Sequence, residues 1–308
     1  MRRRYVTTDV FTDRAFGGNP LAVVLDAEGL TTAAMQAIAR EFGYAETAFV
    51  LPPADPAHTA HIRIFTPIAE LPFAGHPNIG TALVLARHGL PGGVPLPEAM
   101  PQTLMFEELA GLIPVALTRD AAGRAVGAEL TAPEPLSRRG DVTTADIAAL
   151  AGLPVSAIVT GRHPPLVASV GLGFVFAELD SVASLAACVP DAAAFRRLAP
   201  LHGADALMVY VADRADRTIV HARMFAPLDG IPEDPATGSA TAALAALLGE
   251  LSGGDAIALT MRQGEHMGRP SLLHARAARE ARGWIARVAG GAVEIMQGTL
   301  ALPEPAAP

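Results

Sequence analysis

The sequence predicts an α+β fold built twice, each time as a curved, mostly antiparallel sheet wrapped around one central helix. Residues 61–82 and 221–242 are two copies of one pattern, 160 positions apart without a gap and identical at seven positions. In each copy an alternating stretch typical of a strand leads through a Pro-rich loop into an Ala- and Leu-rich run with high helix propensity. The other predicted strands are short, and the regular strand–helix alternation of a doubly wound fold is absent. We therefore interpret the repeat as two equivalent structural units.

Length and composition agree with two units. The chain has 308 residues, which corresponds to about two domains, and its 51% hydrophobic content suffices for two cores. The polar segment 119–124 contains Gly123 and precedes a new predicted strand, so it is the predicted boundary. This places the N-terminal lobe at residues 1–122 and the C-terminal lobe at 123–283.

The first lobe is predicted to begin with strands over residues 4–11 and 21–25. A helix follows over residues 32–42, because Met35, Ile38, Ala39 and Phe42 recur at helical spacing. Thr31 or Thr32 is the expected N-cap. A strand begins near Glu46 and the first repeat copy comes next. Two short strands close the lobe, near 103–107 and 112–117.

The second lobe is predicted to begin with a strand at 126–131. The following elements come from the same propensity and periodicity arguments: a helix near 144–151, strands near 166–170 and 173–178, a helix near 190–198 and strands at 206–211, 260–264, 283–288 and 292–296. The helices of the two repeat copies are expected to end near Gly89 and Gly249. They are apolar nearly all round, so both should be buried.

Charge and motif content exclude several functional classes. The net charge of −8 argues against a nucleic acid or an anionic membrane surface as partner. The sequence has no signal-peptide pattern and no uninterrupted run of about 18 apolar residues. Its single cysteine, Cys188, fits a cytoplasmic protein. We find no metal-binding spacing and no phosphate-binding glycine motif, so neither a metal nor a nucleotide cofactor is expected.

Glu46 is the first candidate for chemistry. It lies among Tyr44, Ala48 and Phe49, and the residues alone leave two interpretations open. The carboxylate is either exposed on the solvent face of an edge strand, or held in an apolar pocket that raises its pKa. The second environment would suit proton transfer near neutral pH.

The small-residue turns of the repeat supply the other candidates. Gly75 and His76 begin the first repeat helix, while Asp234, Gly238 and Ser239 occupy the matching segment of the second copy. Free N–H groups at such helix starts suit a carboxylate or phosphate, so both turns are expected to face one anion across a cleft. A helix cap or packing role for His76, and an Asx-turn and cap for Asp234 and Ser239, remain open. Asn19 follows two glycines and is either a turn residue or part of a site.

Several motifs together resemble the PhzF-like family, named for the phenazine-biosynthesis isomerase. The matching stretches span nearly the whole chain in order: PheThrAspArgAlaPheGlyGlyAsnPro (11–20), GluThrAlaPheVal (46–50), GluLeuProPheAlaGlyHisPro (70–77), AspProAlaThrGlySerAla (234–240) and GlyArgProSer (268–271). The chain departs from the family pattern at Asn78, where threonine is usual.

The resemblance implies a diaminopimelate epimerase-like fold, with C-terminal strands near 284–302 returning to the first lobe. It implies a cofactor-free isomerase, in which the residue matching Glu46 is the general acid/base in the interlobe cleft. By the same resemblance His76 and Asp234 line the site and orient a small carboxylate-bearing substrate, Asn19, Gly75, Gly238 and Ser239 bind it, and the protein forms a homodimer.

Two alternatives remain: a binding protein that keeps the fold without turnover, and an epimerase that uses Glu46 with a second carboxylate such as Asp234. A two-thiol racemase is disfavoured. The relatives that use a cysteine pair carry one cysteine in each Gly-rich loop, where this chain has Ala74 and Ala236.

Overall fold

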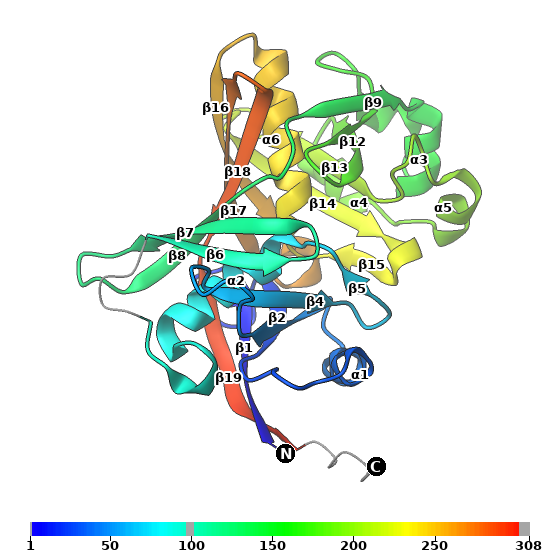
Figure 1. Cartoon of the computed structure of the whole chain (residues 1–308). Coiled ribbons are helices and arrows are strands. Elements are labelled where there is room, and N and C mark those ends of the chain that lie inside the picture. The colour runs from blue at the N-terminus through cyan, green and yellow to red at the C-terminus, as the bar shows by residue number, and fades with distance from the viewer. Residues whose placement is uncertain (1, 97–101, 302–308) are drawn as a thin grey trace. The chain divides into compact units, whose positions relative to one another are not determined.

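The computed structural model describes residues 2–96 and 102–301. The chain forms two compact units, Met1–Leu130 with Gly290–Pro308 as unit 1 and Thr131–Ala289 as unit 2. The sequence-based expectation placed the boundaries at 122/123 and 283/284; residue 302 of the expected returning segment lies outside the described residues. Figure 1 shows the labels of the helices and strands.

The segment predicted as the boundary is a hairpin turn. Asp120 donates its backbone N–H to the Arg124 carbonyl at 3.0 Å, and its carboxylate accepts from the Ala122 and Arg124 N–H groups. The strands on either side, β7 (Gly111–Arg119) and β8 (Ala125–Thr131), pair antiparallel. The strand predicted at 126–131 therefore belongs with the first unit, because it completes a hairpin begun there.

Unit 1 is a mostly antiparallel sheet in the order β19-β1-β2-β3-β4-β6-β7-β8, with parallel pairing only at β2–β3 and β4–β6 among these pairs. Short β5 pairs with β4. Besides β7 and β8, the strands are β1 (Arg2–Val10), β2 (Asn19–Val24), β3 (Glu46–Leu51), β4 (Ala60–Phe65), β5 (Glu70–Leu71), β6 (Thr103–Glu108) and β19 (Ala292–Ala301). The helices are α1 (Thr32–Phe42), α2 (Gly75–His88) and the short η1 (Pro91–Gly93).

Unit 2 repeats this order as β9-β11-β12-β13-β14-β16-β17-β18, with parallel pairing at β12–β13 and β14–β16. Its strands are β9 (Ser137–Asp141), β10 (Ile158–Val159), β11 (Leu166–Ser169), β12 (Gly173–Leu179), β13 (Leu207–Ala212), β14 (Ile219–Ala226), β15 (Ile231–Asp234), β16 (Ala256–Gln263), β17 (Ser271–Glu280) and β18 (Gly283–Gly290). Its helices are α3 (Thr144–Ala151), α4 (Val182–Ala187), α5 (Ala192–Leu198) and α6 (Gly238–Ser252), with short η2 (Val155–Ala157), η3 (Pro227–Asp229) and η4 (Glu265–Met267). The parallel pairs fall at equivalent positions in the two sheets, which is the repeat that the sequence indicated.

Helices α2 and α6 are the buried helices that the repeat predicted. Every residue of α2 from Gly75 to Leu85 is buried, and α6 is buried from Ala240 to Gly249. Helix α2 packs on β1 and β2, and α6 packs on β16 and β17 (Figure 1). Gly80 makes the first contact possible, since a Cβ there would lie 2.5 Å from Leu21 Cδ2 and 2.7 Å from Val10 Cγ2.

Helix α2 ends at Gly89 as predicted, but the prediction for Gly249 is wrong. Helix α6 continues to Ser252 and is capped by Gly253 at φ 74°. Gly249 lies inside the helix, where a Cβ would approach Trp284 Cζ3 to 2.5 Å. The glycine admits the indole ring to the helix surface and does not end the helix.

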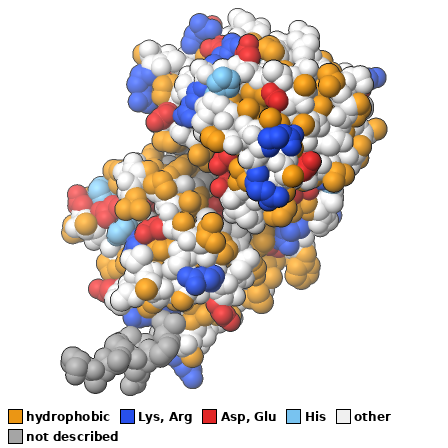
Figure 2. Space-filling view, turned by 90° about the vertical axis from the view of Figure 1, so that its right-hand side faces the viewer, with side chains coloured by type: hydrophobic (Ala, Val, Ile, Leu, Met, Phe, Trp, Pro, Cys, Tyr) orange, Lys and Arg blue, Asp and Glu red, His pale blue; other side chains and the backbone are white. Residues whose placement is uncertain are grey.

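Charged side chains of both signs are interspersed on the face seen in Figure 2, without an extended field of one sign. Among residues 2–96 and 102–301, the structure contains no helix of the length and apolarity that a membrane crossing requires.

Candidate functional site

Three sequence-predicted residues of unit 1 meet at one end of its sheet. Asn19 and Glu46 are the first residues of the parallel neighbours β2 and β3, and Leu21 is the register partner of Glu46. His76 is the second residue of α2, and its Nδ1 lies 3.0 Å from Glu46 Oε2. The His76 side chain is 5% exposed and that of Glu46 14% exposed. Two strand starts and one helix start thus hold a carboxyl and an imidazole in contact.

The His76 ring is neutral. Burial lowers its pKa to about 3, against the smaller opposing effect of a hydrogen bond to the Pro20 carbonyl. A carbonyl only accepts, so the ring carries a proton on the nitrogen that contacts it. Nε2 is buried and has no hydrogen-bond partner among the described residues. The ring proton is therefore on Nδ1, which faces Pro20 and Glu46, and Nε2 presents an unused acceptor lone pair.

The loop before β2 is shaped by a required glycine. Gly18 has φ +60°, and a Cβ there would lie 2.2 Å from the Val10 carbonyl oxygen. Asp9 Oδ2 accepts the Phe16 N–H at 2.7 Å and closes the same loop. Asn19, only 1% exposed, is consequently delivered to the start of β2 in a defined orientation.

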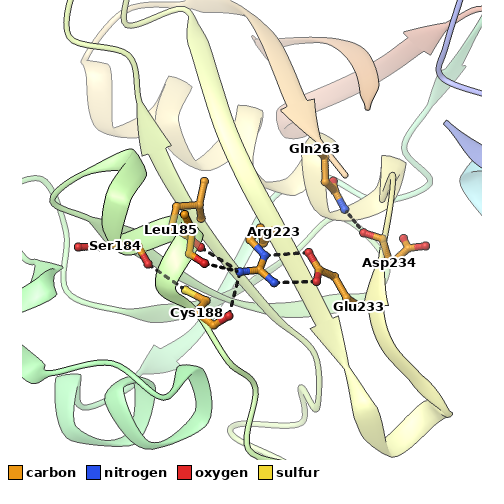
Figure 3. Close-up of polar contacts among 8 residues, drawn as sticks. Ser184, Leu185, Cys188, Arg223, Glu233, Asp234 and Gln263 are labelled. Atoms are coloured by element: carbon orange, nitrogen blue, oxygen red, sulfur yellow. Dashed lines mark hydrogen bonds and ion pairs between the residues drawn. The ribbon is translucent and has the colours of Figure 1, made fainter. Parts of the chain in front are cut away.

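Asp234 of unit 2 is held by Thr237 and Gln263, two residues that the sequence did not reveal, and Figure 3 shows the bond from Gln263. Thr237 Oγ1 donates to Asp234 Oδ2 at 2.5 Å, and Gln263 Nε2 donates to the Asp234 carbonyl at 2.7 Å. Gln263 also donates to Thr237 Oγ1 at 3.0 Å and accepts the Thr237 N–H at 3.2 Å. Because Gln263 donates to the Thr237 oxygen, the hydroxyl proton of Thr237 points to Asp234. A single glutamine at a strand end has no signature that would reveal this role.

The two buried helices begin without side-chain caps. Ala74 and Thr237 are the N-caps of α2 and α6, and neither side chain bonds the first turn. In contrast α1, α3, α4 and α5 are each capped by a side-chain oxygen. The first-turn N–H groups at Gly75 and at Gly238–Ser239 are therefore not taken up by a capping side chain. Together with the unused Nε2 of His76, this makes the start of α2 suitable for an anionic ligand that also carries a hydrogen-bond donor.

The predicted site residues fall into two sets, one in each unit. Unit 1 holds Glu46, His76, Asn19 and Gly75, while Asp234, Gly238 and Ser239 belong to unit 2. Cys188, the single cysteine of the sequence, lies in neither of the two turns. Cys188 is 3% exposed, bonds the Ser184 carbonyl at the end of α4, and has its thiol pKa raised by burial to about 11.

Arg63 and Arg223 occupy matching positions of the repeat, and each pairs with a glutamate of its own unit. Arg63 forms a two-bond fork with Glu70, at 2.7 and 2.6 Å. Arg223 forms the same fork with Glu233, at 2.8 Å for each bond (Figure 3).

Comparison with known proteins agrees with the motifs. A family model described as "PhzC-PhzF: Phenazine biosynthesis-like protein" matches residues 8–298. An uncharacterized isomerase from Mesorhizobium japonicum is 38% identical over 306 residues, covering 97% of this chain and 98% of the relative. The trans-2,3-dihydro-3-hydroxyanthranilate isomerase of Pseudomonas chlororaphis is 36% identical over 302 residues, covering 97% and 99%.

Solved structures show the same fold. The PhzF-family phenazine biosynthesis protein of Bacillus anthracis superposes with a TM-score of 0.83 at 23% identity, covering 98% of this chain and all of that one. A probable proline racemase from Agrobacterium radiobacter gives 0.65 at 15% identity, covering 98% and 93%. The predicted diaminopimelate epimerase-like architecture is thereby confirmed.

Proposed function

The chain belongs to the phenazine biosynthesis-like (PhzC-PhzF) family and is an isomerase, and on this basis we propose that Glu46 is the group that moves the proton. The observation that carries the proposal is the contact of Glu46 Oε2 with the Nδ1–H of a neutral, buried His76. This contact holds the Glu46 carboxyl in one orientation, and in the proposed reaction Glu46 begins as the base.

The proposed isomerisation needs no second reactant, because the proton and the double bond only change position. Glu46 takes a proton from one substrate carbon, the double bond shifts, and the same carboxyl returns a proton to a different carbon. The substrate carboxylate binds the open first-turn N–H groups at Gly75, where the helix dipole also favours negative charge. His76 Nε2 accepts a hydrogen bond from a substrate hydroxyl or amino group.

The relative from Pseudomonas chlororaphis is named for trans-2,3-dihydro-3-hydroxyanthranilate, which carries a carboxylate, an amino group and a hydroxyl. We propose this compound as the first substrate to test, because each of its groups has a counterpart in the site. We further propose that Asn19, Gly238, Ser239 and Asp234 contact the same substrate molecule, with Asp234 accepting a hydrogen bond. The homodimer implied by the resemblance is also proposed, and light scattering should give about twice the chain mass of 31.8 kDa.

The decisive variant is Glu46→Gln, which keeps size and hydrogen bonding but removes the titrating group. We expect its kcat on the true substrate to fall by at least about 10²-fold with little change in substrate binding. Glu41→Gln is the matched control, since Glu41 is exposed on α1 and the charge change is the same. Near-normal turnover of Glu46→Gln would refute the assignment and make Asp234 the next candidate base.

His76→Ala and Asp234→Ala should act differently from Glu46→Gln. Each removes a group that orients the substrate, so binding and turnover should weaken together. A pure kcat effect in either variant would show that the residue acts in proton transfer itself.

A further inference from the structure

The turn between β16 and β17 contains the GlyArgProSer motif (268–271), to which the proposed reaction gives no role. Gln263 ends β16 just before this turn and is the register partner of Ser271. The Gly264 carbonyl accepts the Arg269 N–H at 3.0 Å, and the Ser271 hydroxyl donates to the Arg269 carbonyl at 2.9 Å. Hydrogen bonds of its own therefore hold this turn in one shape.

The turn lies directly against the residues that follow Asp234. Gly264 has φ +75°, and a Cβ there would lie 2.6 Å from the Pro235 carbonyl oxygen, so the approach requires a glycine. This contact places Gln263 beside Asp234 and Thr237. The three residues are 1%, 7% and 8% exposed, so their polar atoms depend on one another for hydrogen bonds.

The side-chain amide of Gln263 has only one possible orientation. Its Oε1 accepts the Thr237 N–H at 3.2 Å, and its Nε2 donates to the Asp234 carbonyl at 2.7 Å. Because an N–H only donates and a carbonyl only accepts, the amide cannot be turned over. Nε2 also donates to Thr237 Oγ1 at 3.0 Å, and the Thr237 hydroxyl in turn donates to Asp234 Oδ2.

Thr237 is the N-cap of α6, yet its side chain does not cap the helix. A threonine at this position ordinarily accepts an N–H of the first turn, as Thr31 does for α1 and Thr143 does for α3. Thr237 differs from them because its oxygen accepts a hydrogen bond from Gln263. The N–H groups at Gly238–Ser239 therefore stay without a side-chain cap.

We propose that Gln263 is a positioning residue of the isomerase: it directs the Thr237 hydroxyl toward Asp234 and away from the first turn of α6. The Asp234 carboxylate is then held in one orientation, and the N–H groups at Gly238 and Ser239 stay open to the substrate. This role rests on the proposed contacts of Asp234, Gly238 and Ser239 with the substrate, whereas the direction of the Thr237 hydroxyl does not.

Replacing Gln263 by methionine tests the direction of the Thr237 hydroxyl. Methionine keeps the length of the side chain and removes both N–H donors, so the Thr237 oxygen becomes available to the Ala240 N–H of α6. A crystal structure of Gln263→Met should show this cap and a hydroxyl turned away from Asp234. Gln297→Met is the matched control, since Gln297 is exposed on β19. A Thr237 hydroxyl that stays on Asp234 in Gln263→Met overturns the proposal.

Binding of anthranilate to the full chain tests the positioning role. Anthranilate carries the carboxylate and the amino group of the proposed substrate, and its aromatic ring has no double bond to shift. Gln263→Met should raise its Kd about 10-fold, less than the roughly 100-fold that a misplacement of about 1 Å can cost in rate. Thr237→Val removes the hydroxyl and should raise the Kd equally. Thr237→Ser keeps a hydroxyl and should bind as the wild type does.

The double variant separates positioning from a general structural role. Because Gln263 acts through the Thr237 hydroxyl, Gln263→Met should change the Kd by less than about 2-fold in a Thr237→Val background. Two losses that multiply, or a Thr237→Val variant that binds as tightly as the wild type, overturn the positioning role.

Failure of the proposed function would be recognised separately. A wild type that does not bind anthranilate would contradict the proposed substrate class, and the crystal structure would still decide the direction of the Thr237 hydroxyl. None of these measurements involves Glu46, so near-normal turnover of Glu46→Gln would refute the proton-transfer assignment alone.

Discussion

Replacing Arg223 by methionine should lower the free energy of unfolding much more than replacing Arg63 by methionine. Arg223 is 7% exposed and lies on β14. Besides the fork to Glu233, its Nη1 donates to the carbonyls of Leu185 at 3.0 Å and Cys188 at 2.9 Å (Figure 3). The Arg223 side chain therefore pairs with the Glu233 carboxylate and donates hydrogen bonds to two carbonyls at the C-terminal end of α4.

Removing one partner of a buried, hydrogen-bonded charge pair costs about 3–5 kcal/mol, because the other charge is left uncompensated. The Glu233 side chain is 15% exposed, so water offsets part of this cost. The Leu185 and Cys188 carbonyls would lose their donor, and this adds about 1–3 kcal/mol each to the cost if water does not reach them. We expect about 3–5 kcal/mol for Arg223→Met.

Arg63 is the internal control. Its fork to Glu70 is as short, but the two side chains are 18% and 19% exposed, and its further bond goes to the exposed Thr32 hydroxyl. The greater access to water reduces the expected cost to about 1–2 kcal/mol.

Urea unfolding at equilibrium measures both costs. The double variant Arg223→Met/Glu233→Gln should recover part of the loss, since no uncompensated charge remains. A cost below about 1 kcal/mol for Arg223→Met, or equal costs at the two arginines, would refute this account of the pair.

Three further outcomes are expected. Gly249→Ala should destabilise the fold by about 1–3 kcal/mol in thermal unfolding, because the collision with Trp284 outweighs a helix-propensity gain of about 1 kcal/mol; a stabilised variant would contradict this. A thiol reagent should modify Cys188 slowly in the native protein and rapidly in urea, since burial raises the thiol pKa to about 11 and thiolate is scarce; equal rates would disprove the burial argument. The hydrogen bond to Arg4 is the main cause that lowers the pKa of Asp26 to about 2. Its contribution to the free energy of unfolding is therefore present above pH 3.8 and lost as the pH falls toward 2. Asp26→Asn should therefore cost about 1 kcal/mol at pH 7 and nothing near pH 2, and a loss independent of pH would show that charge plays no part.

Most of the fold could be predicted from the internal repeat of the sequence. Strand alternation and the apolar helices are local patterns, so the order of elements and the burial of α2 and α6 could be predicted from them. The end of α6 could not, because Gly249 resembles a helix stop and its real role is to admit Trp284 from a distant strand. The turn at 119–124 has the composition of a linker, and only its pairing partners show that it closes a hairpin.

The site was predictable where residues lie within motifs. Glu46 and His76 were chosen as candidates from their motifs, and the structure places their side chains 3.0 Å apart. Gln263 could not be found in this way, because it contacts Asp234 from another part of the chain. Such a contact leaves no pattern in the sequence.

The most direct test of the central claim is transfer of solvent deuterium by wild type and Glu46→Gln. Part of the protons that Glu46 takes from the substrate should exchange with D₂O before they are returned, so the wild type should place deuterium at a carbon different from the one that lost its proton, while Glu46→Gln should place none on the same timescale. NMR of the product made from trans-2,3-dihydro-3-hydroxyanthranilate would show the label and its position. Labelled product from Glu46→Gln at the wild-type rate would contradict the claim, and a label returned to the original carbon with inversion would identify an epimerase instead.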